Sequence, residues 1–487
     1  MRFLSRRDFL RDSALGAAGL ALGHPLLRAA EKAAKKGDAN DTLHVAVVGV
    51  HGRGMAHVGG FLQKSTKTVI THVCDCDTAV IGPAMKKVED AQKAAPKYEQ
   101  DFRRLLDDKS IDIISIATPN HWHALMAVWA LQAGKHVYVE KPVSHNVSEG
   151  RRIVEAARRH NRLCQAGTQC RSMSGMREAI AFVQSGGIGK VSVARGLCYK
   201  SRPSIGKVSG EQPIPKTIDY DLWCGPAAKL PLTRKNLHYD WHWVWNTGNG
   251  DLGNQGIHQM DLCRWGLGKG ELAKSVLSVG GRFGYVDDGQ TPNTQVAVFD
   301  YGDAELIFEV RGLPTKDYKG AKVGVVFHGS DGYLVCSSYD SGTVYDKDGK
   351  EVKKFTTPKG KNGDGGHFAN FVQAVRDGKP EELNGEILEG HLSSALCHLA
   401  NVSYRVGSEQ PYSKTSKAFG DDKAAAETLE RTAEHLKDNR VPQDGTNYRV
   451  GRRLTVDVKN EAFVGDKEAD ALLTREYRAP FVMPKTV

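Results

Sequence analysis

From residue 42 to about residue 166, short apolar runs alternate with segments whose apolar residues recur at helical spacing. This alternation predicts a parallel sheet whose strands are joined by crossover helices. The predicted strands are 43–48, 69–74, 111–117, 136–139 and 162–166. The predicted helices are 53–63, 121–133 and 148–160, with Asn146 or Ser148 as the cap of the last one.

From about residue 167 the pattern changes to successive strand-like runs, many of them joined by Gly and Asp turns. Such a series predicts a large, mainly antiparallel sheet with helices packed on it. The predicted strands are 191–199, 275–281, 295–300, 304–311, 322–328 and 333–337, and the predicted helices are 173–184, 254–266, 368–376 and 386–405.

The fold class is therefore α/β: an N-terminal doubly wound parallel (Rossmann) sheet, then an α+β domain with a large, mainly antiparallel sheet. The 487 residues exceed what one compact core holds, which agrees with two domains. We predict a signal and linker over 1–41, a dinucleotide-binding domain over 42–166 and a substrate or oligomerisation domain over 167–410. Residues 411–487 are charged, predict an irregular extension that wraps a neighbour, and so favour a homo-oligomer.

The N-terminus carries paired arginines, Ser5-Arg6-Arg7-Asp8-Phe9-Leu10, before a weakly apolar run over 14–22. This pattern is typical of a twin-arginine export signal and predicts a periplasmic protein. A basic amphipathic helix is the alternative. The run is too short to cross a bilayer and no later run is long enough, so no membrane span is predicted.

Composition excludes some function classes. The formal charge of +10 is dispersed, without a basic stripe interleaved with aromatic residues, so nucleic acid is not a predicted partner. The nine cysteines are odd in number and lack CxxC spacing, which argues against a disulfide framework. No metal-ligand spacing is present, and no metal is predicted.

A glycine-rich turn follows the first strand. Gly49, Gly52 and Gly54 allow a tight turn, close approach of a pyrophosphate and packing of the next helix, which begins near Arg53. His51 occupies the position of the second glycine in the dinucleotide fingerprint. A histidine fits there only if its side chain points away from the pyrophosphate.

Asp75 lies at the end of the next predicted strand, where a carboxylate can accept hydrogen bonds from the adenosine ribose. Its charge would repel a 2′-phosphate. The predicted cofactor is therefore NAD, with NADP less favoured.

The run at 136–139 ends in Glu140-Lys141-Pro142, at the carboxyl end of a strand where ligands collect. This triplet, together with the glycine turn, resembles the hallmark of the glucose–fructose oxidoreductase / inositol dehydrogenase (Gfo/Idh/MocA) family. The resemblance implies hydride transfer with NAD, Lys141 steadying a developing alkoxide, and Glu140 at the cofactor. It also implies cofactor contacts from the loop Ala117–His123, carried by Thr118, Pro119, Asn120 and His123, although His123 is as readily structural.

A base is also needed for the hydroxyl proton. Asp251, Asn254, His258 and Asp261 recur at helical spacing among residues expected to be core, such as Trp265. Burying a histidine and a carboxylate is costly unless they bond each other or a ligand. The pair is therefore a structural pair or a catalytic one, and the family resemblance favours catalysis.

The family pattern has an aspartate four residues before the histidine, whereas this chain has Asn254. An asparagine can orient the imidazole but cannot stabilise its charged form. His258 is then a weaker base unless Asp251 or Asp261 supplies the missing carboxylate.

Substrate contacts are predicted from two further segments. Arg171 follows the last strand of the first sheet and could hold a hydroxyl or carboxylate group. Tyr239, Trp241 and His242 combine aromatic faces with hydrogen-bonding groups, as sugar sites do, although a core corner has the same composition.

Three functions follow. The first is an NAD-dependent oxidoreductase acting on a sugar or sugar derivative with a tightly bound cofactor that a second carbonyl substrate restores. The second is an NAD-dependent glycosidase working by transient oxidation and elimination, for which His242 or Asp261 would supply the acid. The third is a non-catalytic sugar-binding protein. We predict the first.

Overall fold

The computed structural model describes residues 42–358, 364–415 and 417–487 of the chain. The predicted signal and linker over 1–41 lie outside the described residues. No helix in the described ranges is long and apolar enough to cross a membrane.

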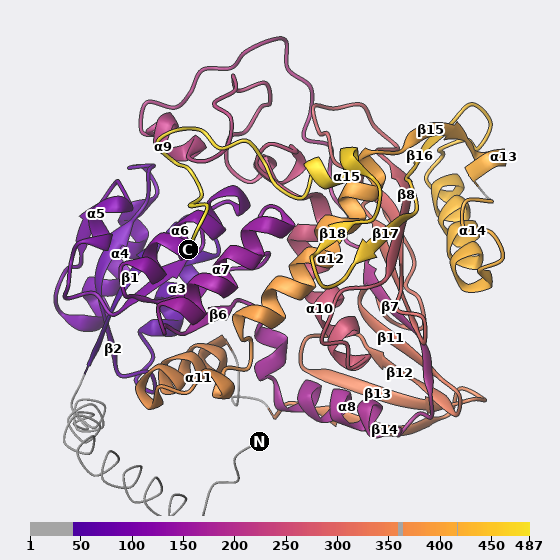
Figure 1. Cartoon of the computed structure of the whole chain (residues 1–487), viewed down its shortest axis with the longest axis horizontal. Helices are drawn as coiled ribbons and strands as arrows, with labels where there is room; N and C mark the ends of the chain where they lie inside the picture. Colours follow the sequence, from indigo (N-terminus) through magenta and orange to yellow (C-terminus); the bar gives the residue numbers. More distant parts are fainter. Residues whose placement is uncertain (1–41, 359–363, 416) are drawn as a thin grey trace, which may run out of the picture. The chain divides into compact units, whose positions relative to one another are not determined.

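The first sheet has six parallel strands in the order β3-β2-β1-β4-β5-β6 (Figure 1). The strand order reverses between β1 and β4, which creates a crevice at their carboxyl ends where ligands bind in such sheets. This is the predicted Rossmann arrangement. The strands are β1 Leu43–Val48, β2 Thr68–Cys74, β3 Lys97–Glu99, β4 Ile113–Ile116, β5 His136–Val139 and β6 Cys164–Ala166.

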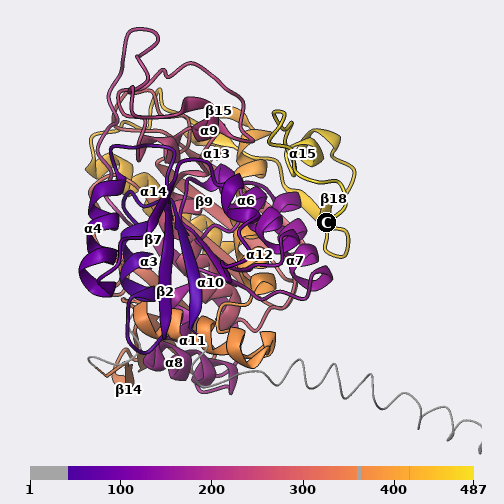
Figure 2. The same cartoon turned by 90° about the vertical axis from the view of Figure 1, so that its left-hand side faces the viewer.

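Helices cover both faces of this sheet (Figure 2). A helix from late in the chain, α11, joins them: its Phe368 and Phe371 share a buried cluster with Phe61. Asn146, rather than Ser148, caps α7, because its side chain accepts a hydrogen bond from the Glu149 amide at 3.0 Å. The helices are α3 Gly54–Phe61, α4 Ile81–Gln92, α5 Arg103–Leu106, α6 Asn120–Gln132, α7 Val147–Arg159 and α11 Asp364–Asp377.

The second sheet has twelve strands, ordered β14-β13-β12-β11-β7-β10-β9-β8-β16-β15, with β17 and β18 beside β8. Within it β7 and β10 run parallel, whereas the other paired neighbours are antiparallel, as predicted for a mainly antiparallel sheet. The strands are β7 Val191–Cys198, β8 Ser275–Gly281, β9 Thr294–Asp300, β10 Glu305–Arg311, β11 Val323–Gly329, β12 Gly332–Cys336, β13 Ser341–Asp346, β14 Glu351–Thr356, β15 Ser408–Pro411, β16 Asn447–Val450, β17 Leu454–Asp457 and β18 Ala462–Phe463.

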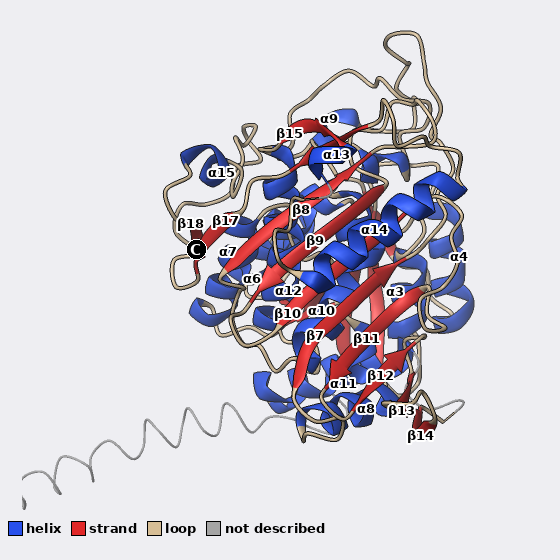
Figure 3. Cartoon of the chain, turned by 90° about the vertical axis from the view of Figure 1, so that its right-hand side faces the viewer, coloured by secondary structure: helices blue, strands red, loops and turns tan. Residues whose placement is uncertain are grey.

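The two faces of the second sheet are covered differently. Alternate residues of the strands face α8 (Ser174–Gln184), α10 (Ile257–Gly266) and α12 (Ile387–Arg405) in the largest buried cluster. On the opposite face lies α14 (Lys423–Asp438), which crosses the sheet in Figure 3. Arg431 of α14 pairs with the fully buried Glu309 at 2.9 Å, so this helix is fixed by charge as well as by apolar packing.

The expectation of an irregular extension over 411–487 is wrong, because α14, β16, β17, β18 and α15 (Lys467–Ala471) fall within it. The expectation that this segment wraps a neighbour also loses its support, because its end packs on the first sheet's helices of its own chain. Phe481, Met483 and Val487 share a buried cluster with Trp122 of α6. Homo-oligomerisation stays a prediction.

We expect Phe481→Ala to lower the free energy of unfolding by about 3 kcal/mol, because it removes a buried ring and leaves a cavity. The Phe481 ring is 1% exposed and lies 5.3 Å from the ring of Trp122. Val482→Ala is the matched control, since Val482 is 46% exposed. Chemical denaturation of both variants checks this, and equal stabilities would show that the chain end is not anchored.

Candidate active site

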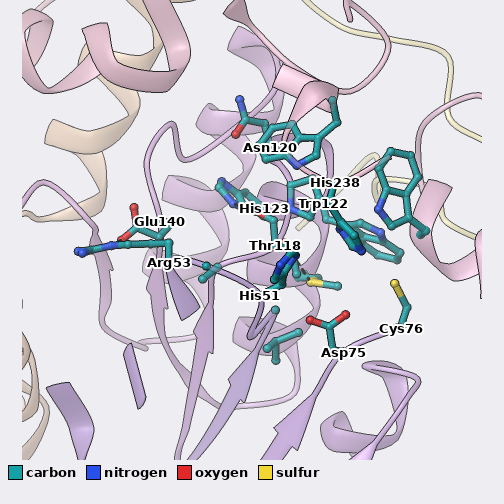
Figure 4. A pocket seen from close by; sticks show the side chains of 18 of the residues that line it. His51, Arg53, Asp75, Cys76, Thr118, Asn120, Trp122, His123, Glu140 and His238 are labelled. Atoms are coloured by element: carbon teal, nitrogen blue, oxygen red, sulfur yellow. Dashed lines mark hydrogen bonds and ion pairs between the residues drawn. The ribbon is translucent and has the colours of Figure 1, made fainter. Parts of the chain in front are cut away.

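A cavity of about 680 Å³ opens at the carboxyl ends of β1, β2, β4 and β5, where the strand order reverses. Three parts of the chain line it: the loops of the first sheet, the start of α10, and a long connection between β7 and α10. We call residues 199–247 of this connection the strap. Figure 4 shows Arg53 and Glu140 on one side of the cavity, Asp75 and Cys76 on the other, and His51 and Thr118 between them.

The glycine turn is shaped for close approach of a ligand. Gly49 has a φ of 79°, and a Cβ there would lie 2.8 Å from the backbone of Ala117 and Thr118. A Cβ at Gly54 would collide with the carbonyl oxygen of Gly49. Gly52 has a φ of 83° and faces open space. The turn therefore leaves a backbone cradle of the kind that a pyrophosphate occupies.

His51, at the position of the second glycine, lines the cavity. Its ring packs edge-on against His238 of the strap, with 4.6 Å between the ring centroids. The ring is thus held to one side by the strap and forms part of the cavity wall, as a histidine at this position requires if it is to leave the glycine turn open to a pyrophosphate.

Asp75 lies at the end of β2, as predicted, and lines the same cavity. Its carboxylate accepts hydrogen bonds from the amides of Val50 at 2.9 Å and Asp77 at 3.1 Å. Burial raises the pKa of Asp75, while these backbone donors act against that rise. Two fixed donors orient the carboxylate and leave it acceptor capacity for ribose hydroxyls.

The strap is fastened to the first sheet beside Asp75. The Asp219 amide donates to the Cys76 carbonyl at 3.0 Å, and the His238 ring lies 2.8 Å from the Asp77 carboxylate. Further along, the Trp122 indole donates to the Leu222 carbonyl at 2.9 Å. The strap therefore covers the end of the cavity where an adenosine would lie.

The end of the chain holds the strap in turn. Arg478 donates to the Asp221 carboxylate at 2.8 Å, to the Asp221 carbonyl at 2.7 Å and to the Gly225 carbonyl at 3.1 Å. Arg475 donates to the side chain of Asn246 at 3.0 Å. With Phe481 anchored on α6, residues 473–487 connect the strap to the first sheet, and we call them the tail.

At the opposite end of the cavity, the Lys141 ammonium donates to the Asn254 carbonyl at 2.8 Å. Burial lowers the pKa of Lys141, although Glu140 opposes this effect. Asn254 does not begin a regular helix as predicted: residues Leu252–Gly256 form a π-helical turn before α10. At Gly256 a Cβ would lie 3.0 Å from the ring of Phe308, so this position of the turn accommodates glycine without displacing that ring.

His258 lines the cavity with Lys141 and Asn254, so the structure brings these three predicted catalytic residues together. Burial, and to a lesser extent the Lys141 ammonium, together lower the pKa of His258 to about 3. Its Nδ1 is buried without a hydrogen-bond partner among the described residues. The imidazole is therefore neutral at physiological pH.

Two predicted site residues belong elsewhere. Asp261 and Arg171 form a buried ion pair, with the guanidinium Nε 2.8 Å from the carboxylate, and Ser393 also donates to Asp261 at 2.7 Å. Neither residue lines the cavity. The buried carboxylate is satisfied by the nearest guanidinium, so Asp261 does not pair with His258 and Arg171 does not face a substrate.

Asp251 does not supply the missing carboxylate either. Arg202 of the strap binds it with two hydrogen bonds of 2.9 and 2.7 Å and also donates to the Tyr239 hydroxyl at 2.7 Å. Tyr239 lines the cavity with a φ of 64°, a conformation that costs energy for a tyrosine and that the Arg202 contact helps to hold.

Glu140 lines the cavity and anchors its wall. It pairs with Arg53 at 2.8 Å and with His57 at 3.0 Å. Burial alone would raise the pKa of Glu140, but the Arg53 guanidinium and the His57 ring outweigh it, so the pKa lies well below its usual range. The carboxylate stays charged and orders the glycine-turn arginine.

The predicted nicotinamide loop also lines the cavity, with Thr118, Pro119, Asn120 and His123. Asn120 donates to the Asn249 side chain at 2.9 Å. The two ring nitrogens of His123 lie 2.7 Å from the carbonyls of Pro142 and Thr118, which ties this loop to the one that follows Lys141. The role of His123 is therefore to position the two loops.

The aromatic cluster predicted for substrate lies in the cavity as well. Trp241 and His242 stack with ring centroids 3.5 Å apart. Burial lowers the pKa of His242 to about 3, and its Nδ1 lies 2.5 Å from the Tyr239 carbonyl.

Sequence reasoning missed four functional side chains: His57, Asp77, Arg202 and His238. Each acts by contact with a residue remote in sequence, such as Glu140 for His57. The cluster at 239–243 was the one sequence signal that pointed to the strap.

The chain matches two family models. Residues 43–168 match the NAD-binding Rossmann domain of the Gfo/Idh/MocA oxidoreductase family, and residues 182–438 match that family's C-terminal alpha/beta domain. Among solved structures, levoglucosan dehydrogenase in complex with NADH and levoglucosan has a TM-score of 0.56 at 19% identity, over 74% of this chain and 97% of that chain. Aldose-aldose oxidoreductase from Caulobacter crescentus has a TM-score of 0.56 at 17% identity, over 74% and 98%. At these identities the likeness establishes the fold.

Curated relatives match shorter stretches. A glycosyl hydrolase family 109 protein of Saccharopolyspora erythraea is 33% identical over 264 residues, 51% of this chain and 52% of the relative. An alpha-N-acetylgalactosaminidase of Shewanella oneidensis is 29% identical over 180 residues, 34% of this chain and 39% of the relative. The chain thus spans about half or less of the length of these relatives.

We expect Asp75→Ala to weaken NAD binding about tenfold and to narrow the preference for NAD over NADP, because the variant loses ribose acceptors and the charge that repels a 2′-phosphate. Asp90→Ala is the control, since Asp90 is an exposed carboxylate outside the cavity. Fluorescence titration with both cofactors measures the ratio. An unchanged preference would show that Asp75 does not face the ribose.

Proposed function

The chain belongs to the Gfo/Idh/MocA oxidoreductase family, and we propose that it is an NAD-dependent oxidoreductase acting on a sugar or sugar derivative. One observation carries this proposal: Lys141 of the first sheet and His258 of α10 meet in a cavity that begins at a dinucleotide-type glycine turn. When bound, NAD supplies the hydride acceptor for an alcohol carbon.

Lys141 is suited to stabilise a developing alkoxide. One of its three N–H groups donates to the Asn254 carbonyl, which fixes the ammonium and leaves two donors for a substrate hydroxyl. Burial strengthens the interaction of the remaining N–H groups with a negative oxygen. The same burial lowers the pKa of Lys141, so the group also releases a proton more readily than an exposed lysine.

His258 is the proposed acceptor of the hydroxyl proton. Its neutral ring can accept a proton, but no carboxylate among the described residues forms an ion pair with it: Asp251 and Asp261 are bound to arginines, and Glu140 and Asp261 favour the charged ring only from a distance. The Asn254 side chain lies on the same wall and can orient a substrate hydroxyl or the ring. The proton transfer therefore depends on Lys141 and His258 acting together.

A sugar fits the other groups of this end of the cavity. Trp241 offers an aromatic face of the kind that packs on the apolar face of a sugar ring, and Tyr239 offers a hydroxyl held by Arg202. His242 adds a neutral ring nitrogen. These groups support a polyhydroxylated substrate over a purely apolar one.

The strap and the tail support tight retention of the cofactor. The strap closes the adenosine end through Cys76 and Asp77, and the tail fastens the strap through Arg478. Retention agrees with our proposal that the twin-arginine segment directs export of the folded protein to the periplasm, where free NAD is scarce. A second carbonyl substrate would then restore the bound cofactor.

A second candidate is glycoside cleavage through transient oxidation and elimination. The observation that favours it is the similarity to proteins named glycosyl hydrolase family 109. Asp261 is excluded as the acid for the leaving group because it is buried on Arg171. His242 would have to supply it, but with its pKa lowered to about 3 the ring is neutral at physiological pH and has no imidazolium proton to donate.

The deciding experiment starts from the purified full chain. We expect NAD to co-purify, and a sugar to produce reduced-nicotinamide absorbance that a keto sugar then bleaches. Release of an aryl alcohol from aryl glycosides without lasting reduction would favour cleavage instead. Sugar binding without either signal would leave a binding protein.

Lys141→Met is the matched variant for this assay. It removes the ammonium but keeps the length of the side chain, so we expect turnover to fall about a hundredfold to a thousandfold, a typical loss on removing a group that stabilises transition-state charge. NAD should remain bound, because the glycine turn and Asp75 are intact. Loss of NAD with the variant would show that Lys141 serves the cofactor.

The pH dependence follows from the two lowered pKa values. His258 is neutral above its pKa of about 3, so we expect kcat/KM to stay level between pH 7 and pH 5. Activity should fall at alkaline pH below the ordinary lysine pKa of 10.5, because Lys141 loses its proton early.

Asn254→Asp tests the origin of this profile. A carboxylate in the wall beside His258 favours the charged imidazole, so it raises the pKa of the ring and moves the acid limb toward pH 6.5. pH–rate profiles of both proteins check this. An acid limb near pH 6.5 already in the unmodified protein would contradict the assignment of His258.

A further inference from the structure

A second cavity, of about 330 Å³, lies behind the loop that follows Lys141. It is lined by that loop (His145), by Asn246 of the strap, by Asn401 and Arg405 of α12, and by Arg475 of the tail. We propose that this rear cavity binds a small hydroxylated oxyanion, a sugar acid or a phosphosugar, between Arg405 and Arg475. The inference does not depend on the proposed redox chemistry.

The charges of the rear cavity favour an anion. In the described part of the chain, neither Arg405 nor Arg475 forms an ion pair with a carboxylate. Burial lowers the pKa of His145, and Arg475 and Arg405 lower it further, which places both guanidinium groups near that ring. Burial lowers the pKa of Arg475; the nearby Glu149 opposes this effect but does not line the cavity. The carboxylate that does line the cavity is that of Glu476, and this side chain is exposed.

Two buried ring or guanidinium nitrogens that lack a hydrogen-bond partner among the described residues also favour an anion. The Arg475 Nε is buried without a hydrogen-bond partner among the described residues, and so is the His145 Nε2. Nδ1 of His145 lies 3.4 Å from an Arg475 nitrogen that can only donate, so Nδ1 is the acceptor and Nε2 carries the proton. The cavity therefore offers N–H donors to an oxyanion.

The ligand also needs a donor of its own. Asn401 is 5% exposed; its amide nitrogen donates to the Asn249 carbonyl at 2.9 Å. Its Oδ1 is buried without a partner in the described ranges. Leaving such an acceptor unsatisfied costs about 1–3 kcal/mol, and a ligand hydroxyl would satisfy it.

The cavity has room for a sugar ring. An adjoining cavity of about 530 Å³ shares Trp245 and Arg405 with it. The Arg405 guanidinium lies 5.2 Å from the centre of the Trp245 ring, so the arginine and an aromatic face are presented together. A carboxylate or phosphate on a ring-shaped ligand matches this pair.

A single residue, Asn249, connects the rear cavity with the candidate active site. Asn249 donates to the His145 carbonyl at 3.0 Å and accepts from Asn120 at 2.9 Å, and Asn120 lines the active-site cavity. Arg475 also connects the tail to the strap through Asn246. An occupant would therefore contact the elements that enclose the cofactor.

The test is calorimetric titration of the full chain with glucuronate, with inorganic phosphate, and with glucose as the neutral probe. We expect saturable binding of glucuronate or phosphate that depends on Arg405 of the rear cavity, and no glucose binding that depends on Arg405. Arg405→Met should weaken that binding about tenfold or more, because it removes a charge-assisted contact. Arg453→Met is the control, since Arg453 is an exposed arginine outside both cavities.

The outcomes separate cleanly. Binding of glucuronate alone identifies a sugar acid, and binding of phosphate identifies a phosphate group; both support the proposal if Arg405→Met weakens them. Glucose binding that Arg405→Met weakens as strongly, or glucuronate and phosphate binding that Arg405→Met leaves unchanged, overturns it. A probe held in the active-site cavity would instead respond to Lys141→Met, which distinguishes failure here from failure of the proposed function. Equal melting temperatures of the variants exclude unfolding as the cause.

Discussion

The hydrogen bond from the Lys141 ammonium to the Asn254 carbonyl is the contact on which the candidate site depends. It joins the first sheet to the π-helical turn before α10, so it sets the distance between the two halves of the cavity. A buried ammonium needs an acceptor, and a backbone carbonyl supplies one without cancelling its charge. The lysine is thereby held in one place and remains positive for a substrate oxygen.

Around this contact, each of three buried carboxylates is bound by basic side chains of its own. Glu140 is bound by Arg53 and His57, Asp251 by Arg202, and Asp261 by Arg171. Each pair satisfies a carboxylate that would otherwise be costly in the interior. His258 shares the cavity with the Lys141 ammonium and with Glu140, which is bound by Arg53 and His57. Burial of the imidazole, together with the Lys141 charge, keeps it neutral.

The strap and the tail add a second layer to the family fold. The tail lies beyond residue 438, where the family match ends, yet it anchors the strap to the first sheet through Arg478 and Phe481. The strap buries an apolar cluster that contains Trp223 and Leu232, and the tail buries Phe481, Met483 and Val487 on the first sheet's helices. Hydrogen bonds to backbone carbonyls add to both. These contacts explain how the strap and the tail, whose sequences show no regular alternation of apolar and polar residues, fold in an ordered way over the cofactor side of the cavity.

The sequence by itself predicted the two sheets in outline, the glycine turn, and the placement of Asp75 and Lys141 at strand ends, because apolar runs, turn residues and glycine spacing are local signals. Strands such as β3, β13 and β14, and the order of the strands, come from the tertiary structure. It also predicted His258 and Asn254 through helical spacing. It could not predict which carboxylate pairs with which arginine, since Asp261 is 90 positions from Arg171 and Asp251 is 49 from Arg202. Within residues 411–487, α14 was missed although it carries local helix signals, a cap at Asp422 and buried apolar residues at helical spacing from Ala425 to Leu436. The short strands β16 to β18 and the tail are ordered by contacts with distant segments, which only the tertiary structure decides.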